Sequence, residues 1–293
     1  MRQMVICHTS QQLKKELADF ATDCKIGFIP TMGALHSGHI SLVKKGVEMS
    51  DKVVVSIFVN PTQFNNLADL ERYPRTVEED CLKLGEAGAH IVFIPSVEDI
   101  YPQEDKRIFD LGGLDRVAEG AMRPGHFNGV AQVVTRLFDL VQPKLAFFGE
   151  KDFQQLAIIR YITKELNCPI EIVACPTVRE SDGVAMSSRN LLLTKEQRES
   201  APHIYKTLKR AVELFEAQNL PHNSIITPLT PELLCKWVFK EIDSESLLKT
   251  EYVELLNSLT LQPVKEWDEA DEIQMCVAVF SGEVRLIDNI KVK

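Results

Sequence analysis

Short apolar runs rich in β-branched residues recur along the first part of the chain, and each has about the length of a strand. Most of them lack the alternation of polar and apolar residues that marks a strand with one solvent-exposed face, so we expect strands buried on both faces. The runs are "IGFIP" (26–30), "DKVVVSIFVN" (51–60), "HIVFIP" (90–95), "KLAFFG" (144–149) and "IEIVACPTV" (170–178).

Segments with helical periodicity separate these runs. They are "GHISLVKKGVEMS" (38–50), "TVEEDCLKLGEAG" (76–88), "NGVAQVVTRLFDLV" (128–141) and "DFQQLAIIRYITKEL" (152–166). This alternation predicts βαβ units and an α/β fold with a Rossmann-like parallel sheet flanked by helices. Ligands of such sheets bind at the carboxyl ends of the strands, where the chain leaves a strand for a helix.

The pattern changes after residue 177, and a smaller α+β domain with an antiparallel sheet is predicted there. A long helical stretch (194–218) precedes a Pro-containing segment (219–242), and three strand-like runs follow at 251–257, 271–280 and 283–292. We therefore expect an N-terminal domain at 1–177 and a C-terminal domain at 178–293.

Composition narrows the class of protein. The 293 residues are 45% hydrophobic and carry a net charge of -9, which argues against nucleic acid as the main partner because phosphate backbones are bound by concentrated Lys and Arg. No apolar run is long enough to span a membrane, and the first residues lack the apolar core of a signal peptide. The seven cysteines are scattered without Cys-x-x-Cys spacing, which favours reduced thiols in a cytoplasmic protein over disulfides or a zinc site.

The stretch "PTMGALHSGHISLV" (30–43) places two histidines in a glycine-containing loop directly after the first run. Ser37 is the expected N-cap, which puts His39 in the first helical turn, where unpaired N–H groups favour an anion. His36 and His39 could then donate to phosphate oxygens, and a protonated imidazole is a suitable acid for a departing pyrophosphate. A capping or buried polar pair remains an alternative, whereas a metal pair lacks a third ligand at a telling spacing.

Two further polar clusters follow later strands. In "FVNPTQFNNLADLERYPRT" (58–76), Asn60 and Gln63 offer neutral amides suited to hydroxyl and carboxylate groups, although an Asn-rich loop needs no ligand. In "EGAMRPGHFNGVAQVVTRL" (119–137), Arg123 and His126 could face a ligand or could simply fix the entry into a helix.

The last two clusters carry cations. In "LAFFGEKDFQQLAIIR" (145–160), Lys151 would lie beside a phosphate and Asp152 would cap the next helix or meet a ribose hydroxyl. In "CPTVRESDGVAMSSRNLLLT" (175–194), a flexible loop with two hydroxyls and Arg189 could close over a triphosphate. A ligand-free helix start and a solvated linker are the respective alternatives. Because the clusters are placed one after each successive parallel strand, together they outline a single crevice with phosphate donors at one end and amides at the other.

At these residues the chain resembles the pantoate–β-alanine ligase (pantothenate synthetase) family. The motifs that carry the resemblance are "PTMGALHSGH", "FVNPTQF", "YPRT", "RPGHFNGV", "FGEKDFQQL", "VRESDGVAMSSRN" and "RLIDN". They run from about residue 28 to 194, with the last near the end, in the family's order and spacing. The His-x-Gly-His element is similar to that of the wider nucleotidyltransferase superfamily.

The resemblance implies a ligation in two steps. The carboxylate of pantoate attacks the α-phosphate of ATP and releases pyrophosphate, and the amine of β-alanine then attacks the pantoyl adenylate to give pantothenate and AMP. The implied catalytic residues are His36, His39, Lys151, Ser187, Ser188 and Arg189, with His39 as the proton donor. The implied ATP contacts are Met32, Gly33, Ala34, Leu35, His36, Ser37, Gly38, His39, Gly149, Glu150, Lys151, Asp152, Val178, Met186, Ser187, Ser188 and Arg189. The implied substrate contacts are Asn60, Gln63 (pantoate and β-alanine), Tyr73 and Gln155 (pantoate).

The resemblance also implies Mg²⁺ that enters with ATP, no tightly bound organic cofactor, and a homodimer formed through the N-terminal domain, with the C-terminal domain as a lid. Glu79 and Asp80 are weaker candidates for contact with the metal. The chain departs from the family between Phe64 and Tyr73, where "NNLADLER" (65–72) replaces a Gly-Pro and acidic sequence.

Two alternatives are weighed against this interpretation. Another nucleotidyltransferase with the same His motif, acting on a small carboxylate or phosphate substrate, should carry more cations than the Asn- and Gln-rich second cluster offers. A catalytically inactive nucleotide-binding scaffold predicts the loss of His39, Lys151 or Arg189, and all three are present.

Overall fold

The computed structural model of the protein describes residues 4–65, 67–218 and 229–293. The chain divides into two compact units. Unit 1 comprises Met1–Gly113, Arg123–Glu150 and Gln155–Val178, and unit 2 comprises Leu114–Met122, Lys151–Gln154 and Arg179–Lys293. The predicted boundary after residue 177 lies next to the end of unit 1 at Val178. Two short segments that the prediction assigns to the first domain, Leu114–Met122 and Lys151–Gln154, belong to unit 2.

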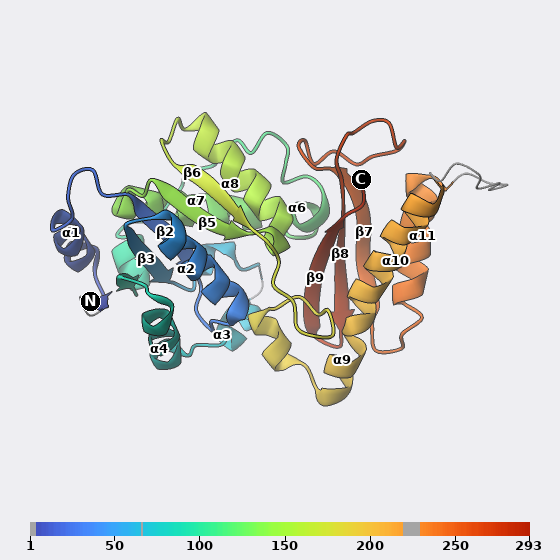
Figure 1. Ribbon diagram of the computed structural model, residues 1–293, viewed down its shortest axis with the longest axis horizontal. Coiled ribbons are helices and arrows are strands. Elements are labelled where there is room, and N and C mark those ends of the chain that lie inside the picture. Colours follow the sequence, from blue (N-terminus) through green and yellow to red (C-terminus); the bar gives the residue numbers. More distant parts are fainter. Residues whose placement is uncertain (1–3, 66, 219–228) are drawn as a thin grey trace. The chain divides into compact units, whose positions relative to one another are not determined.

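Unit 1 is built on a parallel sheet of six strands in the order β1-β4-β3-β2-β5-β6, which confirms the predicted fold class (Figure 1). Its strands are β1 (Val5–Cys7), β2 (Ile26–Thr31), β3 (Lys52–Ile57), β4 (Ile91–Phe93), β5 (Leu145–Gly149) and β6 (Glu171–Cys175). Phe28 and Ile29 of β2 and the three valines of β3 (53–55) are fully buried, as expected of strands covered on both faces.

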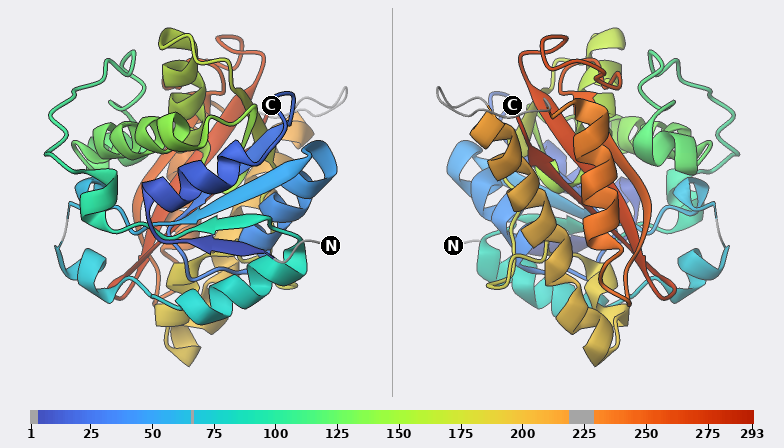
Figure 2. Two further views of the ribbon diagram at one scale, coloured as in Figure 1. Left: turned by 90° about the vertical axis from the view of Figure 1, so that its left-hand side faces the viewer. Right: turned by 90° about the vertical axis from the view of Figure 1, so that its right-hand side faces the viewer.

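Helices cover both faces of this sheet (Figure 2). The helical segments of unit 1 are α1 (Ser10–Ala18), α2 (Ser37–Met49), η1 (Pro61–Gln63), α3 (Leu67–Arg72), α4 (Val77–Ala87), α5 (Val97–Ile100) and α7 (His126–Val141). Apolar residues of α2 and α4 share one core with Ile29 of β2. The neighbouring Phe28 points to the opposite face, where its ring meets that of Phe138 in α7 edge-on, with centroids 6.3 Å apart.

The register of the sheet aligns the places where functional residues were predicted. Thr31 at the end of β2 is the partner of Ile57 at the end of β3. Gly149 and Cys175 pair in the same way at the ends of β5 and β6. The loops that follow β2 and β3 therefore leave the sheet side by side at its carboxyl edge.

Unit 2 is built on an antiparallel sheet of three strands in the order β7-β8-β9. The strands are β7 (Lys249–Asn257), β8 (Ile273–Ser281) and β9 (Val284–Lys291), and the helical segments are α6 (Ala118–Met122), η3 (Ser188–Leu192), α9 (Lys195–Ser200), α10 (Pro202–Gln218) and α11 (Pro231–Ile242). Two helical segments, η2 (Glu150–Asp152) and α8 (Phe153–Glu165), run across the junctions between the units along the chain.

Alternate residues of β8 pack on opposite sides of that sheet. Val277 and Val279 lie in the core with α10 and α11, whereas Cys276 and Ala278 pack against Ala118 of α6. The right-hand view of Figure 2 shows α10 and α11 lying across the strands.

The structure corrects several predicted elements. Strand β1 was not predicted, since three residues are too few to show a pattern. The predicted helix at 194–218 is two helices, because Pro202 begins α10 and cannot continue the hydrogen bonds of α9. The Pro-containing segment contains α11, where Thr230 is the N-cap and Pro231 occupies the first turn; residues 219–228 of that segment lie outside the described residues. The divergent segment 65–72 contains α3.

Candidate active site

The loop after β2 turns sharply and begins with a buried threonine. The hydroxyl of Thr31 donates to the carbonyl of Ser56 on β3 at 2.7 Å and accepts from the N–H of Gly33 at 3.2 Å. Gly33 and Ala34 both have left-handed backbone conformations, with φ of 84° and 50°. A Cβ at Gly33 would also lie 3.0 Å from a methyl group of Ile57, so glycine is needed there for two reasons.

The carboxylate of Asp80 on α4 holds this loop. It is fully buried and accepts from the N–H of Ala34 at 2.8 Å and from that of Leu35 at 2.7 Å. The hydroxyl of Thr76 donates to the same carboxylate at 3.2 Å. Two peptide N–H groups of the predicted phosphate loop are therefore committed to a side chain that lies 46 residues further along the chain.

Neither acidic candidate fits a metal site. Both oxygens of Asp80 already accept hydrogen bonds, and the side chain is inaccessible to solvent. Glu79 is exposed and pairs with Lys83 at 2.8 Å. Among the residues that the structure describes, no group of three His, Cys, Asp or Glu side chains could hold a metal ion.

The histidine pair forms the N-terminal cap of α2. Nδ1 of His36 accepts from the N–H of Gly38 at 3.2 Å, and Nδ1 of His39 accepts from the N–H of His36 at 3.3 Å. The predicted N-cap at Ser37 is thus wrong by one residue, because the imidazole of His36 takes that role. A ring nitrogen that accepts carries no proton, so each neutral ring has its proton on Nε2. The two rings lie together, with centroids 4.1 Å apart.

The amide side chains after β3 form a second group at the same sheet edge. Nδ2 of Asn60 donates to Oε1 of Gln63 at 3.2 Å, and Nε2 of Gln63 lies 3.1 Å from the sulfur of Met32 in the first loop. Both amides are buried, with 1% and 9% of their surfaces exposed. The structure therefore brings together the first two predicted clusters.

The third cluster supports the second through the backbone. Nδ1 of His126 lies 2.8 Å from the carbonyl oxygen of Gln63, and the guanidinium of Arg123 donates to the same oxygen at 3.3 Å. Asn60 also donates to the carbonyl of Gly129 in α7 at 3.1 Å. The structure thus shows Arg123 and His126 in direct contact with the loop that carries Gln63, an arrangement that neither interpretation of this cluster described.

Tyr73 lies at the end of the divergent segment and is buried, with 8% of its surface exposed. Its ring meets that of Phe64 edge-on, with centroids 5.9 Å apart. Tyr73 therefore contacts the residue that follows η1, in the loop that begins at Asn60.

The fourth cluster follows β5. Gly149 ends the strand in unit 1, and Glu150 and Asp152 are exposed. In unit 2, the carbonyl of Lys151 accepts from Nδ2 of Asn289 on β9 at 2.8 Å, and its ammonium lies 4.0 Å from the carboxylate of Asp152. Gln155, in the first turn of α8, is half-buried and belongs to unit 1.

The fifth cluster also forms hydrogen bonds to β9. Arg179 forms two hydrogen bonds to the carboxylate of Asp288, at 2.7 and 2.8 Å, and its guanidinium stacks on the ring of Tyr205. The hydroxyl of Ser187 accepts from the N–H of Arg189 at the start of η3. The segment that was predicted to close over a triphosphate therefore forms hydrogen bonds at Arg179 and at Ser187, and its flexibility stays a prediction.

The remaining predicted residues of the fifth cluster differ in exposure. Ser188 is buried, with 6% of its surface exposed, whereas Val178, Met186 and Arg189 are half-buried. Because Asp288 and Asn289 are neighbours on β9, unit 2 brings the segments of Lys151 and Arg179 to one strand.

The cysteines are all free thiols. Burial raises the pKa of Cys175 and of Cys235 to about 11, and it raises the pKa of Cys276 as well. These thiols are therefore protonated at neutral pH and are poor nucleophiles.

No helix in the described part of the chain has both the length and the apolar character required to cross a membrane.

Comparison with known proteins now defines the family. A family model described as pantoate-beta-alanine ligase matches residues 5–291. The chain belongs to this family. Among its relatives are the pantothenate synthetases of Porphyromonas gingivalis, 49% identical over 98% of this chain and 99% of the relative, and of Bacteroides thetaiotaomicron, 48% identical over 99% of each chain.

Solved structures of pantoate–β-alanine ligases share the fold. That of pantothenate synthetase from Thermus thermophilus has a TM-score of 0.89 at 39% identity and covers 99% of each chain. That of pantoate-beta-alanine ligase from Francisella tularensis, a complex with beta-gamma ATP and beta-alanine, has a TM-score of 0.80 at 35% identity, covering 98% of this chain and 97% of that one.

Sequence reasoning missed residues that act through a distant partner. Asp80 was considered only as a metal contact, and its hydrogen bonds to the loop after β2 cross a long interval of sequence. Tyr101, whose hydroxyl donates to Asn60 at 3.0 Å, was not singled out at all. The one feature of the sequence that could have pointed to Tyr101 is its position shortly after the predicted strand at 90–95.

Proposed function

We propose that this protein catalyses the ATP-dependent condensation of (R)-pantoate with β-alanine to pantothenate, AMP and pyrophosphate, as a ligase of pantothenate and coenzyme A biosynthesis. Membership of the pantoate–β-alanine ligase family over residues 5–291 supports this activity. The observation that carries it is the arrangement at the carboxyl edge of the sheet, where the loop from Met32 to the two histidines, whose Nδ1 atoms accept within the cap of α2, meets the buried amide of Gln63.

A carboxylate is a poor electrophile for an amine, because its leaving group would be oxide. Adenylation supplies AMP as the leaving group instead. In the first step, a carboxylate oxygen of pantoate forms a bond to the α-phosphorus of ATP while the bond to pyrophosphate breaks. In the second step, the amine of β-alanine attacks the activated carbonyl carbon, the bond to AMP breaks, and the amine loses a proton. The N–H donors near the phosphates stabilise the charge that develops on pyrophosphate.

Residues of the first, fourth and fifth clusters are proposed to contact ATP. His36 and His39 would donate from Nε2 to phosphate oxygens, with His39 as the proton donor, because Nδ1 of each ring is used within the cap. Lys151, Ser187, Ser188 and Arg189 would steady the phosphates. Gly149, Glu150, Asp152, Val178, Met186 and the residues from Met32 to Gly38 complete the proposed set.

Asn60, Gln63, Tyr73 and Gln155 are proposed to form the pantoate site, with Gln63 also next to β-alanine. Mg²⁺ is proposed to arrive with ATP, bound by phosphate oxygens and water, since the candidate carboxylates do not fit a resident ion. The place in the wider nucleotidyltransferase superfamily, the homodimer, the cytoplasmic location and the lid role of residues 178–293 stay predictions.

Isotope transfer tests the proposed reaction. With pantoate labelled by ¹⁸O in both carboxylate oxygens, ATP and β-alanine, mass spectrometry should find one ¹⁸O in the AMP, because the oxygen that attacked the α-phosphorus leaves with it. Label in inorganic phosphate, with ADP as the other product, would show activation at the γ-phosphate and would contradict the proposal.

His39→Ala should lower the rate of adenylate formation by about 10²-fold or more, the range expected for loss of a general acid. The measurement is a single-turnover assay of pyrophosphate release with pantoate and ATP. His8→Ala is the matched control, because His8 is exposed and lies outside the proposed site, and it should retain the wild-type rate. Near-full activity of His39→Ala would remove His39 from the role of proton donor.

A further inference from the structure

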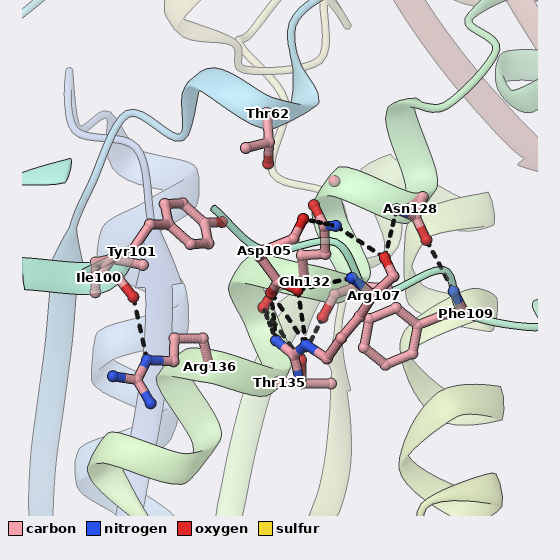
Figure 3. A network of polar contacts seen from close by, with 12 residues as sticks. Thr62, Ile100, Tyr101, Asp105, Arg107, Phe109, Asn128, Gln132, Thr135 and Arg136 are labelled. Carbon is pink, nitrogen blue, oxygen red and sulfur yellow. Dashed lines mark hydrogen bonds and ion pairs between the residues drawn. The ribbon is translucent and has the colours of Figure 1, made fainter. Parts of the chain in front are cut away.

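The irregular chain that follows α5 is fixed by side chains of α7. Nε2 of Gln132 donates to the carbonyls of Asp105 and Arg107, both at 2.9 Å, and Nδ2 of Asn128 donates to the carbonyl of Arg107 at 3.1 Å. Nε of Arg136 donates to the carbonyl of Ile100 at 3.1 Å. Because residues 128, 132 and 136 follow one another at helical spacing, they form one polar stripe that holds the segment 100–109 against α7 (Figure 3).

Tyr101 is fixed at the start of this segment and reaches the second cluster. The carbonyl of Ile100 is directed at Arg136, and the ring of Tyr101 is directed away from it (Figure 3). The hydroxyl of Tyr101 donates to Oδ1 of Asn60 at 3.0 Å. Burial raises the pKa of Tyr101 above its usual value, so the phenol is protonated and able to donate throughout the neutral range.

The hydrogen bonds of Asn60 allow only one orientation of its amide. Oδ1 accepts from Tyr101 and also from the N–H and hydroxyl of Thr62, at 3.3 and 3.1 Å. Nδ2 donates to the carbonyl of Gly129 and to Oε1 of Gln63. A flipped amide would set Nδ2 against the N–H of Thr62 and Oδ1 against two acceptors, and both arrangements leave buried polar groups unsatisfied.

The orientation of Asn60 in turn fixes that of Gln63. Since Oε1 of Gln63 accepts from Nδ2 of Asn60, its Nε2 is the end that remains for other groups. Nε2 lies 3.1 Å from the sulfur of Met32, which is a weak acceptor that an oxygen could replace. The backbone of Gln63 cannot readily turn, because Arg123 and His126 hold its carbonyl oxygen.

We propose that Tyr101 is a positioning residue that acts through Asn60 to present the N–H donors of Gln63 to the substrate. The site then selects a substrate that bears oxygen acceptors, a carboxylate or hydroxyls, at the position facing Gln63. A group that only donates hydrogen bonds at that position is rejected, since it would meet another donor. This inference rests on the proposed function and on the role of Gln63 within it.

Tyr101→Phe removes the hydroxyl and keeps the ring. The KM for pantoate should rise by about 3- to 10-fold, the effect of one neutral hydrogen bond, while kcat and the KM for ATP change by less than about 2-fold. Tyr161→Phe is the matched control, because the hydroxyl of Tyr161 forms no hydrogen bond within the described residues, and its kinetic constants should equal those of the wild type. An unchanged KM for pantoate in Tyr101→Phe overturns the inference.

A double-mutant cycle shows whether Tyr101 acts through Gln63. In a Gln63→Ala background, Tyr101→Phe should leave the KM for pantoate unchanged, since the group that it orients is gone. An equal rise in both backgrounds would mean that Tyr101 acts by another route and would overturn the inference. The wild-type protein separates the two hypotheses: inactivity with pantoate overturns the proposed function and this inference together, whereas the Tyr101→Phe outcomes bear on the inference alone.

Discussion

At the scale of single residues, the shape of the loop after β2 depends on one buried carboxylate. Asp80 accepts from two consecutive peptide N–H groups, those of Ala34 and Leu35, at the point where the backbone is left-handed. Lys83, also on α4, donates to the carbonyl of Leu35 at 2.7 Å. One turn of α4 thus holds both polar groups of Leu35, and His36 follows directly as the cap of α2.

Asp80→Asn should weaken both stability and ATP binding. The amide nitrogen would face one of the two N–H groups, so the free energy of unfolding should fall by about 2–3 kcal/mol, the value of a buried hydrogen bond to a charged acceptor. The KM for ATP should rise more than that for pantoate, because the loop that carries His36 shifts.

Chemical denaturation and steady-state kinetics are the measurements for this variant. Glu86→Gln is the control, because Glu86 is an exposed acid on the same helix and should behave like the wild type. A variant of Asp80 with wild-type stability would show that the two N–H groups do not need the carboxylate.

Residue types and their place along the chain predicted the histidine pair and the amides of the second cluster, and the structure places Gln63 against Met32, in the loop that leads to the histidines. The sequence could not show how they are oriented. The N-cap at His36 rather than Ser37 depends on a rotation of the imidazole toward its own helix. The role of Asp80 depends on the packing of α4 against the loop, which no local pattern encodes.

At the scale of elements, α7 and η1 approach each other so closely that only glycine fits between them. A Cβ at Gly129 would lie 2.7 Å from the carbonyl carbon of Thr62 and 2.9 Å from the backbone nitrogen of Gln63. Both atoms belong to the backbone, so a side chain could not displace them without moving η1. The contact sets the distance between the helix and the loop of the proposed pantoate site.

Gly129→Ala should therefore cost about 1–3 kcal/mol of stability through overpacking and should raise the KM for pantoate. Gly85→Ala in α4 is the matched control, because its Cβ would meet only the side chain of Met4 at 3.8 Å. That control should stabilise the protein by about 0.5–1 kcal/mol through helix propensity. Thermal unfolding compares the two variants, and equal stabilisation by both would contradict the close approach.

Periodicity located β2 to β6 and the long helices between them, because strands buried on both faces are continuous apolar runs. It failed where a short element depends on its neighbours. Strand β1 has three residues and is defined by pairing with β4. The helix α11 follows a Pro-containing stretch that reads as a loop, although Thr230 and Pro231 are themselves a helix start.

At the scale of the whole molecule, the units are not continuous in sequence. The segment with α6 is tied to the sheet of unit 2 by Glu119, which accepts from Arg285 at 2.7 and 2.8 Å and from the hydroxyl of Tyr252 at 2.9 Å. Burial of Arg285 alone would lower its pKa, but Glu119 and Glu251 offset this and raise it, so the guanidinium stays charged. A sequence-based division at one point could not anticipate such an interleaved chain.

Glu119→Gln should destabilise unit 2 selectively. Removal of one charge from a buried ion pair leaves Arg285 with Glu251 alone, and a loss of about 3 kcal/mol is expected. Hydrogen exchange followed by mass spectrometry should show faster exchange in β7 to β9 and unchanged exchange in β2 to β5.

Glu283→Gln, in the exposed turn between β8 and β9, is the control and should leave all rates unchanged. Equal acceleration in both sheets by Glu119→Gln would argue against separate stability of the two units.

In the proposed reaction, the protein activates pantoate as an adenylate before any amine takes part. Exchange of labelled pyrophosphate into ATP, measured with pantoate present and β-alanine absent, tests this most directly. Exchange should require pantoate and should fall to background without it. Exchange that proceeds equally without pantoate, or that is absent from an enzyme that still forms pantothenate, would contradict it.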